Sequence, residues 1–327
     1  MRLSFIHTLV LLVAVFFSAP AQIQAQAIGE KNVSVNISPT NPSPGENYTL
    51  SLITYSFDLN RSTITWSVNG TKILSGIGKS TYEGVMGSLG ETTQIKIVIE
   101  AGLLVIEKNI SLVGTDMDLI WEAIDSYVPP FYKGKALPSP EARINVVAIP
   151  LLQDGTSLLG SDNITYAWNR NYSPDLGSSG YGKNSFIFRT SYLNQSDKIT
   201  ASSTAITKNL SAKQTIDIRT IKPKILFYPI QNKSANTIHA LKNSITVNGD
   251  SYTIIAVPYF FSGENPDVKD LSYTWKVNNQ QLQVFSPKNT LTIQKGEATN
   301  GTIDLTIESI SKLLQSAKSK MTINFQK

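Results

Sequence analysis

Short segments in which apolar and polar residues alternate run through most of this chain of 327 residues. The clearest is Tyr273-Thr274-Trp275-Lys276-Val277, in which every second residue is apolar and aromatic or branched. The segment over residues 303–307 alternates in the same way. A period of two is typical of a β-strand with one buried and one solvated face. The pattern therefore predicts an all-β protein.

One signature occurs three times at intervals of about one hundred residues, which is the length of a domain rather than of a solenoid repeat. Each copy has a Trp on a predicted strand and an Asn three positions later. A Lys–polar–hydroxyl–apolar quartet follows thirteen to fifteen residues after the Trp. The copies are Trp66 with Asn69 and residues 79–82, Trp168 with Asn171 and residues 183–186, and Trp275 with Asn278 and residues 288–291.

Each copy predicts the same order of elements: a β-branched strand, the Trp strand, a tight turn and then further strands that close the unit. Asn69-Gly70 is a strong signal for a two-residue hairpin turn. The copies predict three domains, over residues 32–114, 115–220 and 221–327. Neither connection is a flexible Gly/Ser linker, so we expect a semi-rigid rod.

Two segments have apolar spacings that also fit a helix. In residues 116–126 the repeat register favours a strand, because this segment corresponds to the opening strand of the third unit. Residues 309–320 lie between two predicted strands, and their spacing is compatible with a helix of one or two turns.

Seven or so short strands per hundred residues, with a Trp on the third, resemble the immunoglobulin-like (Ig-like) sandwich. Trp66-Ser67-Val68-Asn69-Gly70 is similar to the W-x-V-N-G turn of the PKD-type repeats found in bacterial surface proteins. The acidic, glycine-rich turn of that pattern is missing in all three units. The resemblance implies three tandem sandwiches in which Trp66, Trp168 and Trp275 fill the structural core. A sugar-stacking platform is the alternative role for these rings.

The N-terminus predicts a signal peptide over residues 1–27. Arg2 precedes an apolar run of about thirteen residues, which is short for a membrane span. Small residues then offer two A-x-A cleavage sites, and an uncleaved membrane anchor is the alternative. We therefore expect a secreted or cell-envelope protein. The absence of cysteine excludes disulfides and thiolate chemistry, and in an exported chain it favours a bacterial source.

The titratable residues offer little chemistry. The net charge of +5 includes no dense Lys/Arg block, so we expect no nucleic-acid partner. His239 is the only imidazole after the signal peptide, and there is no G-x-S-x-G motif. We expect no catalytic residues, no cofactor and no metal. Two acidic groups could serve a glycosidase or a weak calcium site, although solvation of loops explains them more simply: Glu122 with Asp125, and Glu264 with Asp267 and Asp270.

Aromatic residues around a Pro pair are the best candidates for a contact surface. Tyr127, Phe131 and Tyr132 could bind a partner or pack an interdomain joint, and we favour the joint. A lesser cluster consists of Tyr228 and residues 259–261.

The sequence predicts a non-catalytic, exported cell-envelope or extracellular protein that presents a rod of Ig-like modules. Its partner would be a protein or a glycan at the cell envelope. The alternative function is a carbohydrate-binding or glycoside-hydrolysing accessory of a surface enzyme system.

Overall fold

The computed structural model describes residues 32–154, 157–231, 234–262, 271–284, 288–296, 300–309 and 315–326. The predicted signal peptide and the acidic residues Glu264, Asp267 and Asp270 therefore lie outside the described residues. The described part of the chain consists of strands, turns and loops with two single-turn 3-10 helices, Leu59–Arg61 and Ser161–Asn163. The all-β prediction is confirmed.

The first domain is a sandwich of a three-stranded and a four-stranded sheet. Its strands are β1 (Ser34–Ser38), β2 (Asn47–Ile53), β3 (Thr63–Val68), β4 (Thr71–Ile77), β5 (Thr81–Val85), β6 (Thr92–Ala101) and β7 (Leu104–Val113). The strand order is β1-β2-β5 in one sheet and β4-β3-β6-β7 in the other. All neighbouring strands are antiparallel.

The second domain repeats this arrangement. Its strands are β8 (Asp116–Ala123), β9 (Arg143–Leu151), β12 (Ile164–Arg170), β13 (Ser173–Tyr181), β14 (Ser185–Arg189), β15 (Ser196–Ala205) and β16 (Ser211–Arg219), with a small hairpin of β10 (Gln153–Asp154) and β11 (Ser157–Leu158). The sheets have the orders β14-β9-β8 and β13-β12-β15-β16. The strand predicted near residue 116 is confirmed as β8.

The third domain has the same two sheets with extra edge strands. Its strands are β17 (Lys224–Gln231), β18 (Ser234–Ala235), β19 (Ser244–Val247), β20 (Ser251–Tyr259), β21 (Leu271–Val277), β22 (Gln280–Leu282), β23 (Thr290–Gln294), β24 (Asn300–Ser309) and β25 (Ser316–Phe325). The sheet orders are β18-β17-β20-β23 and β19-β25-β24-β21-β22. The β19–β25 pair is parallel.

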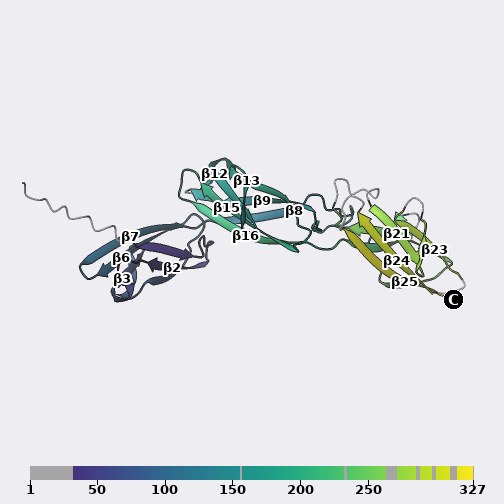
Figure 1. Cartoon of the computed structure of the whole chain (residues 1–327), viewed down its shortest axis with the longest axis horizontal. Coiled ribbons are helices and arrows are strands. Elements are labelled where there is room, and N and C mark those ends of the chain that lie inside the picture. Colours follow the sequence, from purple (N-terminus) through teal and green to yellow (C-terminus); the bar gives the residue numbers. More distant parts are fainter. Residues whose placement is uncertain are drawn as a thin grey trace, which may run out of the picture.

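Three tandem Ig-like sandwiches thus follow one another along the chain. In each, the strand after the Trp hairpin joins the two opening strands, and the hairpin pairs with the two closing strands. Figure 1 shows the three sandwiches in sequence order along the long axis of the molecule, with the C-terminal end at the far tip of the third.

The helix predicted within residues 309–320 is wrong where the structure describes that segment. Residues 316–325 form β25, which pairs antiparallel with β24 over nine residue pairs. Ala317, Met321 and Ile323 are buried in the core of the third domain, and polar residues alternate with them. Hydrogen bonds to strands on both sides therefore override a spacing that also fits a helix. Residues 310–314 lie outside the described residues.

Each domain has its own apolar core built around its Trp. Trp66, Trp168 and Trp275 are all 0% exposed. The indole Nε1 of each donates to the main-chain carbonyl of the Lys that opens the quartet, at 2.8, 2.9 and 2.8 Å. The recurring quartet therefore supplies the hydrogen-bond acceptor that a buried indole needs.

Candidate functional site: the joint between the second and third domains

The segment between β8 and β9 places the predicted contact aromatics against the third domain. The Phe131 ring meets the Tyr228 ring edge to face, with centroids 5.4 Å apart. Tyr132 meets Tyr259 and Phe260 in the same way, at 5.6 and 5.8 Å. Edge-to-face pairs of this kind stabilise packing beyond the area they bury.

These rings belong to a separate apolar cluster at the joint. Tyr228, Tyr259 and Phe260 are each about 5% exposed. The Tyr228 and Tyr259 hydroxyls lie 2.7 Å apart in a hydrogen bond. Burial and this hydrogen bond raise the pKa of Tyr259 above its ordinary value. The joint thus has a buried interior, and the Tyr259 phenol there is held in its neutral form.

Main-chain hydrogen bonds connect the same two segments. The Tyr127 N–H donates to the Phe261 carbonyl at 2.8 Å, and the Phe260 N–H donates to the Tyr127 carbonyl at 2.7 Å. Ser126 and Ser262 form an antiparallel bridge beside them. Phe260 has a φ of 64°. A bulky residue adopts such a conformation only when its surroundings impose it. The joint therefore fixes backbone as well as side chains.

A buried amide crosses the joint. Gln315 is 1% exposed. Its Oε1 accepts from the Ser262 N–H at 2.7 Å, and its Nε2 donates to the Pro140 carbonyl of the second domain at 2.5 Å and to the Ser262 hydroxyl. Because a buried amide is costly to leave unpaired, these bonds hold the two domains in register.

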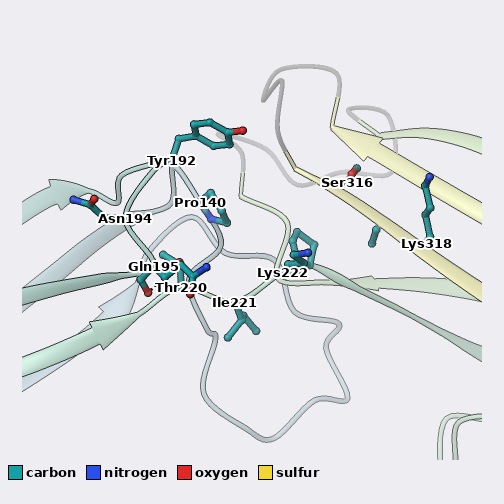
Figure 2. A pocket seen from close by; sticks show the side chains of 11 residues that line it. Pro140, Tyr192, Asn194, Gln195, Thr220, Ile221, Lys222, Ser316 and Lys318 are labelled. Atoms are coloured by element: carbon teal, nitrogen blue, oxygen red, sulfur yellow. Dashed lines mark hydrogen bonds between the residues drawn. The ribbon is translucent and has the colours of Figure 1, made fainter.

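An open cavity of about 750 Å³ lies beside this packed region, between the second and third domains. Figure 2 shows Tyr192 and Asn194 on the second-domain side and Ser316 and Lys318 on the third-domain side, with the Tyr192 ring projecting toward the third domain. Ligand pockets often occur at such domain interfaces. The cavity is therefore the main candidate for a binding site at the joint.

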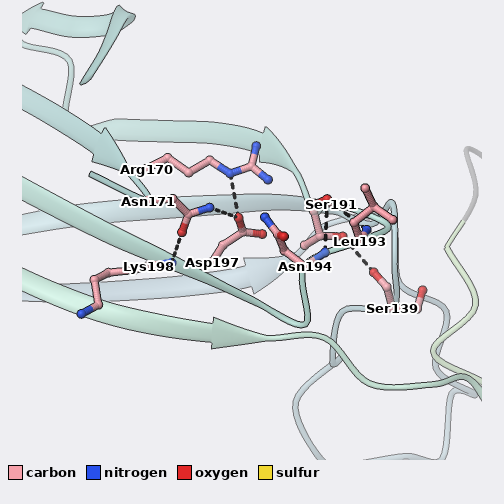
Figure 3. A network of polar contacts seen from close by, with 9 residues as sticks. Ser139, Arg170, Asn171, Ser191, Leu193, Asn194, Asp197 and Lys198 are labelled. Carbon is pink, nitrogen blue, oxygen red and sulfur yellow. Dashed lines mark hydrogen bonds and ion pairs between the residues drawn. The ribbon is translucent and has the colours of Figure 1, made fainter. Parts of the chain in front are cut away.

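A buried ion pair stabilises the second domain next to the Trp168 hairpin. Asp197 is 0% exposed, and its Oδ1 accepts from the Arg170 Nε and from the Asn171 Nδ2, both at 2.9 Å. Figure 3 shows the Arg170 and Asn171 side chains converging on this carboxylate. The guanidinium of Arg170 also lies 4.5 Å from the centroid of Phe188. The network holds β12 against β15.

The other predicted residues are dispersed. His239 is exposed in the loop before β19, and Glu122 is exposed on β8. Asp125 accepts from the Arg143 N–H at 2.7 Å and lies 3.9 Å from the guanidinium of Arg189. Across the described ranges, no group of three or more His, Cys, Asp or Glu residues could hold a metal ion. Within the same ranges no helix has the length and hydrophobicity that a membrane span requires.

No protein-family model and no curated protein sequence matches this chain significantly. Among solved structures, three N-terminal domains of the Highly Immunogenic Outer Capsid protein of bacteriophage RB49 are similar, with 10% identity, a TM-score of 0.27, and coverage of 90% of this chain and 98% of that one. Fibronectin(III)-like modules of Clostridium thermocellum CbhA have 12% identity, a TM-score of 0.26, and coverage of 58% and 94%. The Bacteroides ovatus glucan-utilization protein SGBP-B, in complex with a mixed-linkage heptasaccharide, has 12% identity, a TM-score of 0.21, and coverage of 90% and 70%.

Main-chain hydrogen bonds and a side-chain hydroxyl hold the short connection between the first and second domains. The Gly90 N–H donates to the Gly114 carbonyl at 2.8 Å, and the Gly114 N–H donates to the Glu91 carbonyl at 3.0 Å. A Cβ at Gly114 would lie 2.2 Å from the Ser88 carbonyl oxygen. Only glycine fits at such a close approach of two backbones. The Thr115 hydroxyl then donates to the Ser211 carbonyl at 2.6 Å, so this short connection is tied on both sides.

The sequence indicated the aromatic residues of the joint but not its polar ones. Gln315 stands alone in a segment with helical spacing, and Tyr192, Asn194 and Gln195 lie in an ordinary polar loop. Lys222 and Lys318 belong to no motif. These polar residues therefore share no sequence signal that marks them as parts of one site.

Proposed function

We propose that this chain is a non-catalytic, extracytoplasmic structural and binding protein, in which three Ig-like domains form a semi-rigid rod. The packed joint between the second and third domains carries this proposal. There, Phe131 and Tyr132 of the segment after β8 meet Tyr228, Tyr259 and Phe260 of the third domain. Such packing suits a spacer that holds its modules at a set angle.

The location of the aromatic rings supports this role in preference to a surface enzyme. The three core Trp rings are fully buried and cannot stack on a sugar. We therefore propose that Tyr127, Phe131 and Tyr132 serve the interdomain joint and that a partner binds through other residues. The domain limits near residues 114 and 220 are part of the proposal.

Small-angle X-ray scattering of the chain without residues 1–27 tests the rod. We expect an elongated particle with one well-defined maximum dimension. The double variant Phe131→Ala/Tyr132→Ala should broaden the distance distribution, because it removes three ring pairs from the joint. Tyr55→Ala is the matched control, since Tyr55 is 99% exposed. Profiles that are identical for the wild type and the double variant, or a flexible wild type, would contradict the proposal.

A further inference from the structure

We propose that the cavity at the joint between the second and third domains binds a short acidic oligosaccharide, one that carries uronate carboxylates. This inference rests on the proposed function, because both domains must be held at a set angle to form the cavity. Six side chains carry the argument: Tyr192, Asn194, Gln195, Lys222, Ser316 and Lys318, all of which line the cavity.

The size and position of the cavity suit a small ligand. Its volume of about 750 Å³ is typical of pockets that hold small molecules. Tyr192, Asn194 and Gln195 come from the loop between β14 and β15, whereas Ser316 and Lys318 come from β25. A ligand in this cavity would therefore contact both domains at once.

The neutral lining groups suit a sugar. Tyr192 is 52% exposed. Its ring offers a face on which the C–H groups of a pyranose can pack. The side chains of Asn194, Gln195 and Ser316 make no hydrogen bond within the described part of the chain, so their donors and acceptors are available. Amides and hydroxyls together can both donate to and accept from sugar hydroxyls.

The charges in the cavity specify an acidic ligand. Lys222 and Lys318 line it, both are exposed, and neither forms an ion pair with any residue that the structure describes. No carboxylate is among the lining residues. A lysine ammonium acts as a point charge on a flexible stem and can approach a carboxylate from several directions. Two such groups in one cavity favour a ligand with more than one carboxylate.

The distribution of charge along the chain also favours an acidic ligand. Residues 32–220 carry fifteen basic and sixteen acidic side chains, whereas residues 221–327 carry twelve lysines and seven acidic side chains. The positive net charge of the protein therefore comes from the third domain. A field of this sign raises the local concentration of an anionic ligand near the cavity.

Isothermal titration of the chain without residues 1–27 tests the proposal, with trigalacturonate as the probe and maltotriose as the neutral control. We expect trigalacturonate to bind and maltotriose to bind at least about tenfold more weakly, and we expect affinity to fall as salt is raised. Lys222→Ala/Lys318→Ala and, separately, Tyr192→Ala should each weaken trigalacturonate binding about tenfold or more.

Lys320→Ala is the matched control, because Lys320 lies two residues further along the same strand, outside the cavity, and pairs with Asp304 at 3.9 Å. It should leave affinity unchanged, and thermal melting should show that all variants fold. No binding of trigalacturonate, equal binding of maltotriose, or equal loss in Lys320→Ala would overturn the proposal. If a penta-glutamate peptide bound at the same lysines more tightly than trigalacturonate, the assignment of the ligand as a sugar would be overturned. Small-angle scattering tests the rod separately. A protein that is elongated in solution but does not bind trigalacturonate would therefore contradict the binding site and leave the proposed rod standing.

Discussion

The Oδ1 of Asn69 accepts a 2.9 Å hydrogen bond from the main-chain N–H of Gln94, while the Asn69 N–H donates to the Gln94 carbonyl at 2.8 Å. Asn69 thereby ties the hairpin turn to the start of β6. The same pair of bonds joins Asn171 to Lys198 and Asn278 to Thr302. The Asn that follows each Trp by three positions is therefore a structural clamp that recurs in all three domains.

Asn69 stabilises the turn in two ways, through its side-chain hydrogen bond and through its tolerance of a positive φ, and two variants separate these effects. Asn69 also has a φ of 48°. L residues other than Asn and Asp rarely adopt such a value. Asn69→Ala should cost about 1–2 kcal/mol, because it loses the side-chain bond and retains the unfavourable φ. Asn69→Gly loses only the bond and should cost less. Urea unfolding of both variants measures the difference, and an equal loss would contradict the role of φ.

The buried indoles make a second prediction. Trp66→Phe removes the donor to the Lys79 carbonyl while keeping an aromatic ring, and it should cost about 1–3 kcal/mol. Trp66→Ala should cost about 3–5 kcal/mol, because it also leaves a cavity. Trp121→Phe is the matched control, since Trp121 is only half-buried under Lys135 and should lose less. Thermal and urea denaturation measure these losses, and a larger loss for Trp121→Phe would refute the role of the core indole.

Because Arg170 and Asp197 form a buried pair, the losses in free energy of unfolding caused by substituting each residue should not add. Arg170→Ala should cost about 2–3 kcal/mol, because it leaves a buried carboxylate without its cation. Asp197→Asn in the Arg170→Ala background should recover part of that loss, since the buried group is then neutral. A double-mutant cycle by chemical denaturation measures the coupling. If the losses in free energy of unfolding were additive, the two side chains would contribute to stability independently, which would contradict the role of the pair.

The joint predicts a loss of stability at alkaline pH. Burial and the Tyr228 hydroxyl raise the pKa of Tyr259, so the folded state favours the neutral phenol. A raised pKa contributes stability that is complete below the unfolded value of about 10 and lost as pH rises above it. Tyr259→Phe should lower the urea midpoint at neutral pH, because Tyr228 loses its partner, yet decline less steeply above about pH 10. An unchanged decline would exclude Tyr259 as its source.

Local chemistry explains which parts of the fold the sequence predicts. Asn69-Gly70 predicts its own hairpin, because both positions take positive φ, as a type I′ turn requires. Asn278-Asn279 adopts the same conformation, with φ values of 48° and 66°. Asn171-Tyr172 also has positive φ at both positions. Tyr is unfavourable at the second position of such a turn, so the pair does not predict a hairpin from the sequence. The conformation of a turn is set by a few neighbouring residues, so it can be predicted from the sequence.

Long-range pairing explains what the sequence does not predict. The spacing of residues 309–320 fits a helix, and only pairing with β24 and β19 selects a strand for residues 316–325. The Gln315 bonds to Pro140 and Ser262 join positions that are 175 and 53 residues apart. The cavity likewise combines a loop of one domain with a strand of the next. No local pattern encodes such contacts.

An electron–electron distance measurement tests most directly whether the joint holds the second and third domains in one orientation. The chain contains no cysteine, so spin labels attach only at introduced positions. Exposed Thr165 on β12 and exposed Thr246 on β19 suit the pair Thr165→Cys/Thr246→Cys. We predict one narrow distance distribution that broadens when Phe131→Ala/Tyr132→Ala is added. A distribution that is already broad in the otherwise wild-type protein would contradict the account.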